Sequence, residues 1–141
     1  MLKLIQRKRR LLLLCFLWGI LLAALALQPD KAVNFFLPFS IMRDAAHAVT
    51  YGLMAFFLCL YLRFRRHILG IPMSFLNAAL LALVLTALWG GFTEWTQRFI
   101  PDRCVSIKDW ACDMIGAFFG IAAFRLRELG YVKEGLSKIR R

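Results

Sequence analysis

The sequence predicts an all-α integral membrane bundle of four transmembrane helices, because the chain is strongly apolar and its apolar residues are gathered into four segments. Hydrophobic residues make up 61% of the 141 residues, and the mean hydropathy is +0.65. This hydrophobic share is well above that of soluble globular domains. A chain of this length holds one small bundle, so we expect a single membrane domain over residues 1–141.

Three of the apolar segments are long enough to cross a bilayer as helices, which takes roughly 20 residues. The first helix is expected at about residues 11–28 and the second at about 44–62. The third is expected at about residues 71–97, with Pro72 in its first turn, where a proline is tolerated.

The fourth segment, at about residues 109–126, is short for a transmembrane helix. It crosses a bilayer only if Asp109 and Arg125 lie at the two interfaces, where charged side chains are tolerated. The tail at residues 127–141 follows an apolar stripe flanked by basic residues, which predicts a short amphipathic helix lying on the inner leaflet. The stripe consists of Leu126, Leu129, Val132, Leu136 and Ile139.

The N-terminal segment permits a second interpretation, since a basic stretch followed by an apolar core is also typical of a cleavable signal peptide. The apolar core of such a peptide has about 7–15 residues. The run from Leu11 to Leu27 has 17 residues. We therefore favour a retained first helix and keep a cleaved leader as the alternative.

Lysine and arginine residues predict the orientation of the bundle, because the more basic side of a membrane protein faces the cytoplasm. Fourteen of the 19 basic residues fall on the side that holds both termini. We therefore expect both termini in the cytoplasm. The net charge of +11 is interpreted as an orientation signal and a contact for anionic lipid headgroups, and no nucleic-acid partner is expected.

Polar and ionisable residues gather at the predicted outer ends of three helices. Residues three, four or seven positions apart share one face of a helix. Three such sets are present: Asp44, His47 and Tyr51 near the start of the second helix, Glu94 and Gln97 near the end of the third, and Asp109 and Asp113 at the start of the fourth. The sequence therefore predicts one polar cluster beneath the loop that carries Arg103.

Small residues continue the polar face of the fourth helix. Gly116 and Gly120 follow Asp109 and Asp113 at spacings of three and four residues. Small residues at four-residue spacing let two helices approach closely. We therefore expect this face of the fourth helix to turn inward against a neighbouring helix.

These polar residues resemble the VanZ-like family of small bacterial membrane proteins, over about residues 30–125. The matching residues are Asp44, His47, Tyr51, Glu94, Gln97, Pro101, Arg103, Asp109, Asp113 and Gly116. The sequence departs from the family pattern at Ala45, where a lysine is common, at Asp102, where glycine is common, and at Asp113, where asparagine is common. The resemblance implies a multi-pass membrane protein. Some members are linked to low-level resistance to glycopeptide antibiotics such as teicoplanin, but no reaction comes with the family.

Each polar feature also has a structural interpretation. Asp44 and Asp109 are expected at helix N-termini, where a carboxylate caps free N–H groups and meets the positive end of the helix dipole. Glu94 and Arg103 are able to form an ion pair that holds the loop. Ionisable residues inside a membrane are nevertheless functional candidates by default, and several of them converge here.

The cluster has the residue types for general acid–base chemistry on a lipid-linked phosphate or sugar, in which an arginine holds the anion. The candidate catalytic residues are Asp44, His47, Glu94, Arg103 and Asp109. The candidate substrate-binding residues are Tyr51, Gln97 and Asp113. No resident cofactor is expected. A histidine with several carboxylates is able to bind a divalent metal, but the spacing matches no known metal signature.

The cysteines follow no CxxC pattern. Cys15 and Cys59 lie within predicted helices and are interpreted as small apolar residues. Cys104 and Cys112 both lie near the predicted outer face, where a disulfide is permitted but not implied.

Two classes of function remain open from the sequence. The first is a bacterial plasma-membrane protein that acts on or binds a lipid-linked or cell-wall intermediate at the outer leaflet. The alternative is a non-catalytic assembly or regulatory protein in which the polar cluster locks the bundle. A transporter is less favoured, since four helices are few. The substrate and the oligomeric state are left open.

The segment at residues 93–113 is expected to fold back as a cap over the outer end of the bundle. Pro101 would stop the third helix, and Asp109 would start the fourth. Buried carboxylates that repel one another need a cation, so Arg103 is predicted to pair with Glu94, Asp109 or Asp113.

Overall fold

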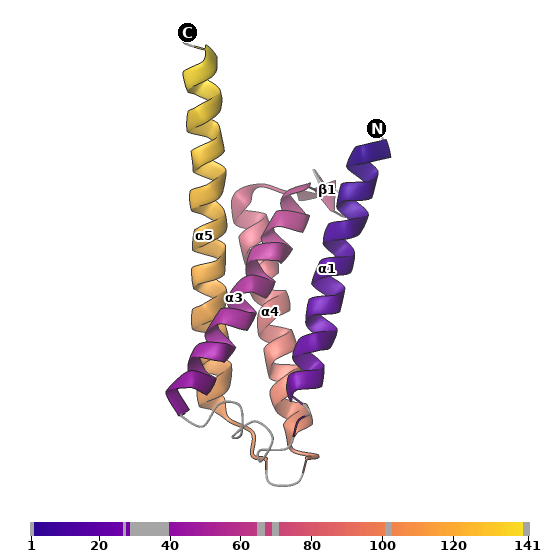
Figure 1. Ribbon diagram of the computed structural model, residues 1–141, viewed down its shortest axis with the longest axis vertical. Coiled ribbons are helices and arrows are strands. Elements are labelled where there is room, and N and C mark those ends of the chain that lie inside the picture. The colour runs from indigo at the N-terminus through magenta and orange to yellow at the C-terminus, as the bar shows by residue number, and fades with distance from the viewer. Residues whose placement is uncertain are drawn as a thin grey trace.

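Four helices lie side by side in the part of the chain that the computed structural model describes, which confirms the predicted all-α bundle (Figure 1). The structure describes residues 2–26, 28, 40–64, 67–68, 71–100 and 103–139. The helices are α1 (Leu2–Ala26), α3 (Ser40–Phe64), α4 (Phe75–Gln97) and α5 (Ile107–Ile139). Strands β1 (His67–Ile68) and β2 (Ile71–Pro72) form a short antiparallel pair between α3 and α4.

The two ends of the bundle differ. α1 begins and α5 ends at the same end, here called the terminal end (Figure 1). The start of α3, the end of α4 and the start of α5 lie at the opposite end, here called the loop end, together with the connection between α4 and α5. The side chains of the predicted polar cluster come from these three helix ends.

Two of the helices are long and apolar enough to cross a membrane. They are Ile41–Phe64 within α3 and Phe75–Gln97, which is the whole of α4. α1 contributes a shorter apolar stretch, Leu12–Ala24. The length and composition of the described helices thus support two of the four predicted membrane spans.

The third helix begins later than expected. α4 starts at Phe75, and Ser74 is its N-cap, whose side chain accepts a hydrogen bond from the backbone N–H of Asn77 at 3.2 Å. Pro72 lies in β2 and not in the first turn of the helix, so that prediction was wrong. A serine oxygen satisfies one of the free N–H groups of the first turn, which favours a start directly after Ser74.

The fourth predicted helix and the predicted tail form one continuous helix. α5 runs for 33 residues from Ile107 to Ile139 and extends beyond the other helices at the terminal end (Figure 1). The side chains of Val132, Leu136 and Ile139 lie outside the described ones. The prediction that the tail lies on the inner leaflet therefore stays a prediction.

Glycines bring α3 and α5 into close contact, which confirms the predicted inward face of the fourth helix. A Cβ atom at Gly116 would overlap the backbone carbonyl of Ala48, and one at Gly120 would overlap the carbonyl of Gly52. Both overlaps involve backbone atoms, which cannot rotate away as a side chain can. The two helices are therefore able to approach to backbone contact only because these positions carry no side chain.

Apolar packing ties the remaining helices to this pair. One core cluster joins Cys59 and Leu62 of α3 with Ala78 and Ala82 of α4 and Phe124 of α5. A second cluster places Leu22 of α1 against Tyr51 and Met54 of α3. The indole N–H of Trp18 donates to the backbone carbonyl of Thr50 at 2.9 Å. α1 is therefore packed into the bundle.

An ion cluster links three helices at the terminal end. Glu128 of α5 accepts hydrogen bonds from Arg63 Nε of α3 and from Arg125 Nη1, each at 2.8 Å. Arg63 Nη1 also donates to the backbone carbonyl of Met73, and the Arg125 guanidinium lies 4.5 Å from the centre of the Phe75 ring. Partial burial would raise the pKa of Glu128, but the hydrogen bonds from the two arginines outweigh it and lower that pKa below its usual value.

A methyl group at Gly116 or Gly120 should destabilise the bundle, because backbone atoms occupy the space it needs. We expect Gly116→Ala and Gly120→Ala to lower the free energy of unfolding by about 3 kcal/mol each, as for severe overpacking. The measurement is the melting temperature of the detergent-solubilised chain. Gly130→Ala is the matched control, because a Cβ there has no described atom within 4 Å. A Gly120→Ala variant as stable as Gly130→Ala would contradict the close contact.

The stability should depend on the charge of Glu128 in acid. Because its pKa is lowered in the folded chain, its stabilisation is fully present above the ordinary value of 4.5 and is lost as the pH falls through the lowered value. Glu128→Gln should therefore reduce the melting temperature at pH 7 and reduce it less at pH 3. An equal reduction at both pH values would show that the charge is not involved.

Candidate functional site

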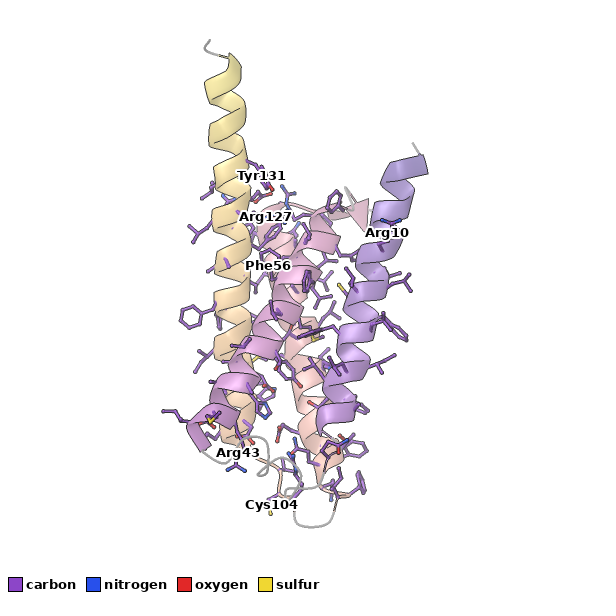
Figure 2. The ribbon with its side chains drawn as sticks, viewed as in Figure 1. Arg10, Arg43, Phe56, Cys104, Arg127 and Tyr131 are labelled. Atoms are coloured by element: carbon purple, nitrogen blue, oxygen red, sulfur yellow. The ribbon has the colours of Figure 1, made fainter. Side chains whose placement is uncertain are left out.

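The predicted site residues lie at the loop end of the bundle. Figure 2 shows Arg43 and Cys104 at this end, and Arg127 and Tyr131 of α5 near the opposite end. We define the polar cluster as the side chains from α3, α4 and α5 that are wholly or largely buried at the loop end. They are His47, Tyr51, Thr93, Glu94, Gln97 and Asp113.

The centre of the polar cluster is a histidine–aspartate pair between α3 and α5. His47 Nδ1 lies 2.8 Å from Asp113 Oδ1. The Asp113 side chain is 0% exposed, whereas that of His47 is 25% exposed. Asp113 lies one helical turn before Gly116, so the close approach of α3 and α5 brings its carboxylate to His47. The imidazole of His47 is also stacked parallel to the ring of Tyr51, with ring centres 6.3 Å apart.

Glu94 of α4 is the second buried carboxylate, at 3% exposed. Its Oε1 accepts a hydrogen bond from Gln97 Nε2 at 3.0 Å, and its Oε2 accepts one from the backbone N–H of Ser106 at 3.0 Å. Both oxygens of Glu94 therefore have partners, and the second partner ties α4 to the residue that precedes α5.

Ser106 was missed by the sequence analysis. Its side-chain oxygen accepts a hydrogen bond from the backbone N–H of Asp109 at 3.1 Å, and its carbonyl accepts one from Trp110 N. It is therefore the N-cap of α5, so Asp109 does not start or cap that helix as predicted. Asp109 lies in the first turn, where a carboxylate meets the positive end of the helix dipole. The serine followed three residues later by an acidic residue resembles a capping box and was the available signal.

Thr93 was also missed. Its hydroxyl lies 2.6 Å from the hydroxyl of Tyr51, and it donates to the carbonyl of Gly90 within α4. Both side chains are buried. The hydroxyl of Tyr51 thus has a partner on α4, while its ring stacks with His47 of its own helix. Thr86, Thr93 and Gln97 lie on one face of α4 at spacings of seven and four residues, and this spacing was the available signal.

Arg103 contacts the polar cluster in another way than predicted. Its Nη1 donates to Gln97 Oε1 at 3.3 Å. Among the described residues, neither Glu94 nor Asp109 nor Asp113 forms an ion pair with it. The amide of Gln97 accepts from Arg103 and donates to Glu94, so the arginine reaches that carboxylate through a neutral relay.

Asp44 lies at the rim and outside the polar cluster. Its Oδ2 accepts a hydrogen bond from Lys108 Nζ at 2.7 Å, and the lysine is exposed. This contact with Asp44 raises the pKa of Lys108 above its usual value. Asp44 is the fifth residue of α3, so it does not cap that helix as predicted. The structure thus brings together His47, Glu94, Gln97, Tyr51 and Asp113, with Asp44 and Asp109 around them.

The remaining predictions for this end concern the loop and the cysteines. α4 ends at Gln97, before Pro101, but Pro101 and Asp102 lie outside the described residues. Cys104 is exposed, Cys112 is partly buried, and both are free thiols. The disulfide that the sequence permitted is therefore not formed in this structure.

The arrangement offers two kinds of chemistry. A carboxylate that holds one nitrogen of a histidine leaves the other nitrogen for proton transfer. In addition, His47, Glu94 and Asp113 each place one potential ligand atom within 4.8 Å of the other two, a grouping able to hold a metal ion. Residue types and helical spacing in the sequence indicated both kinds of chemistry. The contacts between these side chains became known from the fold.

Comparisons with known proteins test the resemblance directly. No curated protein and no solved structure matches the chain. The family model for VanZ/LLP1 matches residues 2–128, which include every residue of the polar cluster and all four helices up to the ion cluster at Glu128. The chain therefore belongs to the VanZ/LLP1 family.

Proposed function

We propose that this chain is a multi-pass protein of the bacterial plasma membrane whose polar cluster faces outward and acts on the headgroup of a lipid-linked cell-wall intermediate. The observation that carries the proposal is the pairing of His47 with the buried Asp113 beside Glu94. Charged side chains inside an apolar bundle are costly unless they are used or fully paired. Family membership and the two apolar helices of spanning length support the membrane location.

All four helices cross the membrane in this proposal, with both termini in the cytoplasm. α1 begins and α5 ends at the same end of the bundle (Figure 1), as an even number of crossings requires. Fourteen of the 19 basic residues belong to that end by the order of the segments. The packing of α1 against Tyr51 and Met54 favours a retained first helix over a cleaved leader.

His47 is the proposed proton-transferring group. When Nδ1 carries the proton and donates to Asp113, Nε2 is left as the base. The side chain is 25% exposed, so a headgroup at the loop end is able to reach it, whereas Asp113 is sealed from solvent and acts through His47. Glu94 is the second proposed acid–base group.

The other candidate residues hold the headgroup. Arg103 supplies a cationic donor for a phosphate, and its contact with Gln97 places it beside Glu94. Tyr51 supports the imidazole through ring stacking. Asp44 and Asp109 lie at the rim, where they control which charges approach the polar cluster.

A second candidate function is supported by Glu94. Both of its oxygens already accept hydrogen bonds within the chain, and one of these bonds ties α4 to the cap of α5. This is the arrangement expected of a structural lock in a non-catalytic assembly or regulatory protein. The two functions differ in what happens when the imidazole is replaced without loss of its hydrogen bond.

Replacement of His47 by asparagine makes this distinction, because the amide NH₂ lies close to the position of Nδ1 but cannot transfer a proton at neutral pH. We expect His47→Asn to keep the expression level and melting temperature of the unmodified chain. We also expect it to abolish the rise in the inhibitory concentration of teicoplanin that the unmodified chain gives to a susceptible host. Cys104→Ser, at an exposed position of the same end, is the control and should keep the phenotype.

Full tolerance with His47→Asn would show that the imidazole is not needed and would favour the structural lock. Loss of expression in His47→Asn together with normal expression of Cys104→Ser would also favour the structural lock. An unmodified chain that leaves teicoplanin sensitivity unchanged would contradict the proposed link to glycopeptide tolerance.

Reporter fusions test the orientation separately. Fusions after Arg66 and after Arg141 should report the cytoplasm, and a fusion within residues 103–106 should report the outside, since the positive-inside rule places the basic end inside. The readout is a pair of reporters that are active on opposite sides of the membrane. An external C-terminus would place the polar cluster on the cytoplasmic face and remove the proposed access to outer-leaflet intermediates.

A further inference from the structure

We propose that His47, Glu94 and Asp113 form a binding site for one divalent transition-metal ion of the Zn²⁺ or Mn²⁺ type. The inference deepens the proposed function, on which the catalytic meaning of the ion rests, but binding of the ion can be measured without it. The three residues come from α3, α4 and α5, one from each helix. The site would therefore join the three helices at the loop end.

The distances suit a site that closes on an ion. One potential ligand atom from each residue lies within 4.8 Å of the other two. Nitrogen and oxygen ligands lie about 2.0–2.2 Å from zinc, so a tetrahedral site separates them by about 3.4 Å. The widest gap between the ligand atoms would therefore have to shorten by about 1.4 Å when an ion binds.

An unpaired carboxylate oxygen supplies an independent indication. Asp113 is 0% exposed, and its Oδ1 is held by His47. Its Oδ2 is also buried, yet it has no hydrogen-bond partner among the described residues. A buried oxygen without a partner carries the full cost of its desolvation, and a bound ion is one of the few things that removes this cost.

Asp113 Oδ2 lies opposite a glycine of α4. A Cβ atom at Gly90 of α4 would lie 3.0 Å from Asp113 Oδ2 and would crowd it. Glycine at this position therefore leaves room beside the oxygen that a methyl group would fill. The next turn of α4 carries Glu94, so Asp113 Oδ2 and the second carboxylate lie in the same region.

The charge of the polar cluster favours a cation. Glu94 and Asp113 are both buried, and two carboxylates in a low-dielectric site repel each other. Arg103 donates to the amide of Gln97, which in turn donates to Glu94. A divalent ion would offset both carboxylates directly and would use Oδ2 of Asp113.

The donor set indicates the class of ion. One imidazole and two carboxylates suit Zn²⁺ or Mn²⁺, whereas Ca²⁺ and Mg²⁺ prefer oxygen ligands alone. Three protein ligands leave a fourth position for water or for an oxygen of a bound headgroup, as in catalytic zinc sites. This position gives a carboxylate-rich cluster a way to accept an anionic phosphate, which it would otherwise repel.

The experiment measures metal binding by the full chain in detergent. The purification tag is removed, bound metal is stripped with a chelator, and ZnCl₂ or MnCl₂ is titrated by isothermal calorimetry. We expect saturable binding of about one equivalent, lost or weakened at least tenfold in Asp113→Asn and in Glu94→Gln, in line with the loss of a metal ligand or its supporting group. The bound ion should also raise the melting temperature of the unmodified chain.

Two controls separate this site from other ligands. Glu128→Gln removes a carboxylate at the terminal end and should leave the affinity unchanged. A Cys104→Ser/Cys112→Ser double variant removes the thiols of the loop end and should also bind as the unmodified chain does. His47→Asn provides a third ligand substitution if either carboxylate variant fails to fold. The affinity of this variant for the metal ion should fall as well.

Three results would overturn the proposal: absence of saturable binding, binding that persists unchanged in the folded ligand variants, or binding that disappears with the thiols. The outcome is distinguishable from that of the proposed function. Metal binding with no effect on teicoplanin tolerance would leave the site standing and contradict the function. A tolerance phenotype that depends on His47 without metal binding would overturn the site alone.

Discussion

The backbone contact between α3 and α5 is the constraint on which the rest of the structure depends. Gly116 and Gly120 lie against the carbonyls of Ala48 and Gly52, so any side chain at these glycines would push the helices apart. The separation set here holds along both helices. At one end it allows Asp113 to reach His47, and at the other it allows Glu128 to reach Arg63. These two polar contacts between the helices are thus consequences of an apolar contact without side chains.

The bundle confines its described ion pairs to its two ends. The middle is held by apolar clusters and by hydroxyls that bond within their own helix, as Thr86 does to the carbonyl of Ala82. The terminal end holds two arginines around Glu128. The loop end instead holds two buried carboxylates with one histidine, and Arg103 is linked to Glu94 through Gln97. Among the described residues, the buried carboxylates that lie close together are at the loop end, which makes this end the candidate site.

The family membership and the geometry support each other at different levels. The match over residues 2–128 assigns the chain to its family, but it does not identify a reaction. The contacts of His47, Asp113 and Glu94 define what chemistry the chain is equipped for. A histidine held by a buried carboxylate is suited to proton transfer, and the same three residues have the composition of a metal site. The two properties are alternative uses of His47, since a ring nitrogen that binds an ion is not available to transfer a proton.

The sequence by itself determined the helical class, the segments that become helices and five of the six members of the polar cluster, all but Thr93. Apolar segments of spanning length and helical spacing of polar residues are local properties, so His47, Glu94, Gln97 and Asp113 could be placed on one end of the bundle in advance. The spacing of Gly116 and Gly120 also indicated the inward face of α5. These inferences held because they depend on periodicity, which the chain expresses residue by residue.

Only the tertiary structure decided the partners. Asp44 pairs with Lys108 and does not cap a helix. The amide of Gln97 accepts from Arg103 and donates to Glu94. The backbone N–H of Ser106 and the hydroxyl of Thr93 complete the contacts of the polar cluster, although neither residue is ionisable. The physical reason is that hydrogen bonds are short and directional. Which donor reaches which acceptor depends on ångström-scale offsets between helices, and these offsets follow from the close packing of α3 on α5.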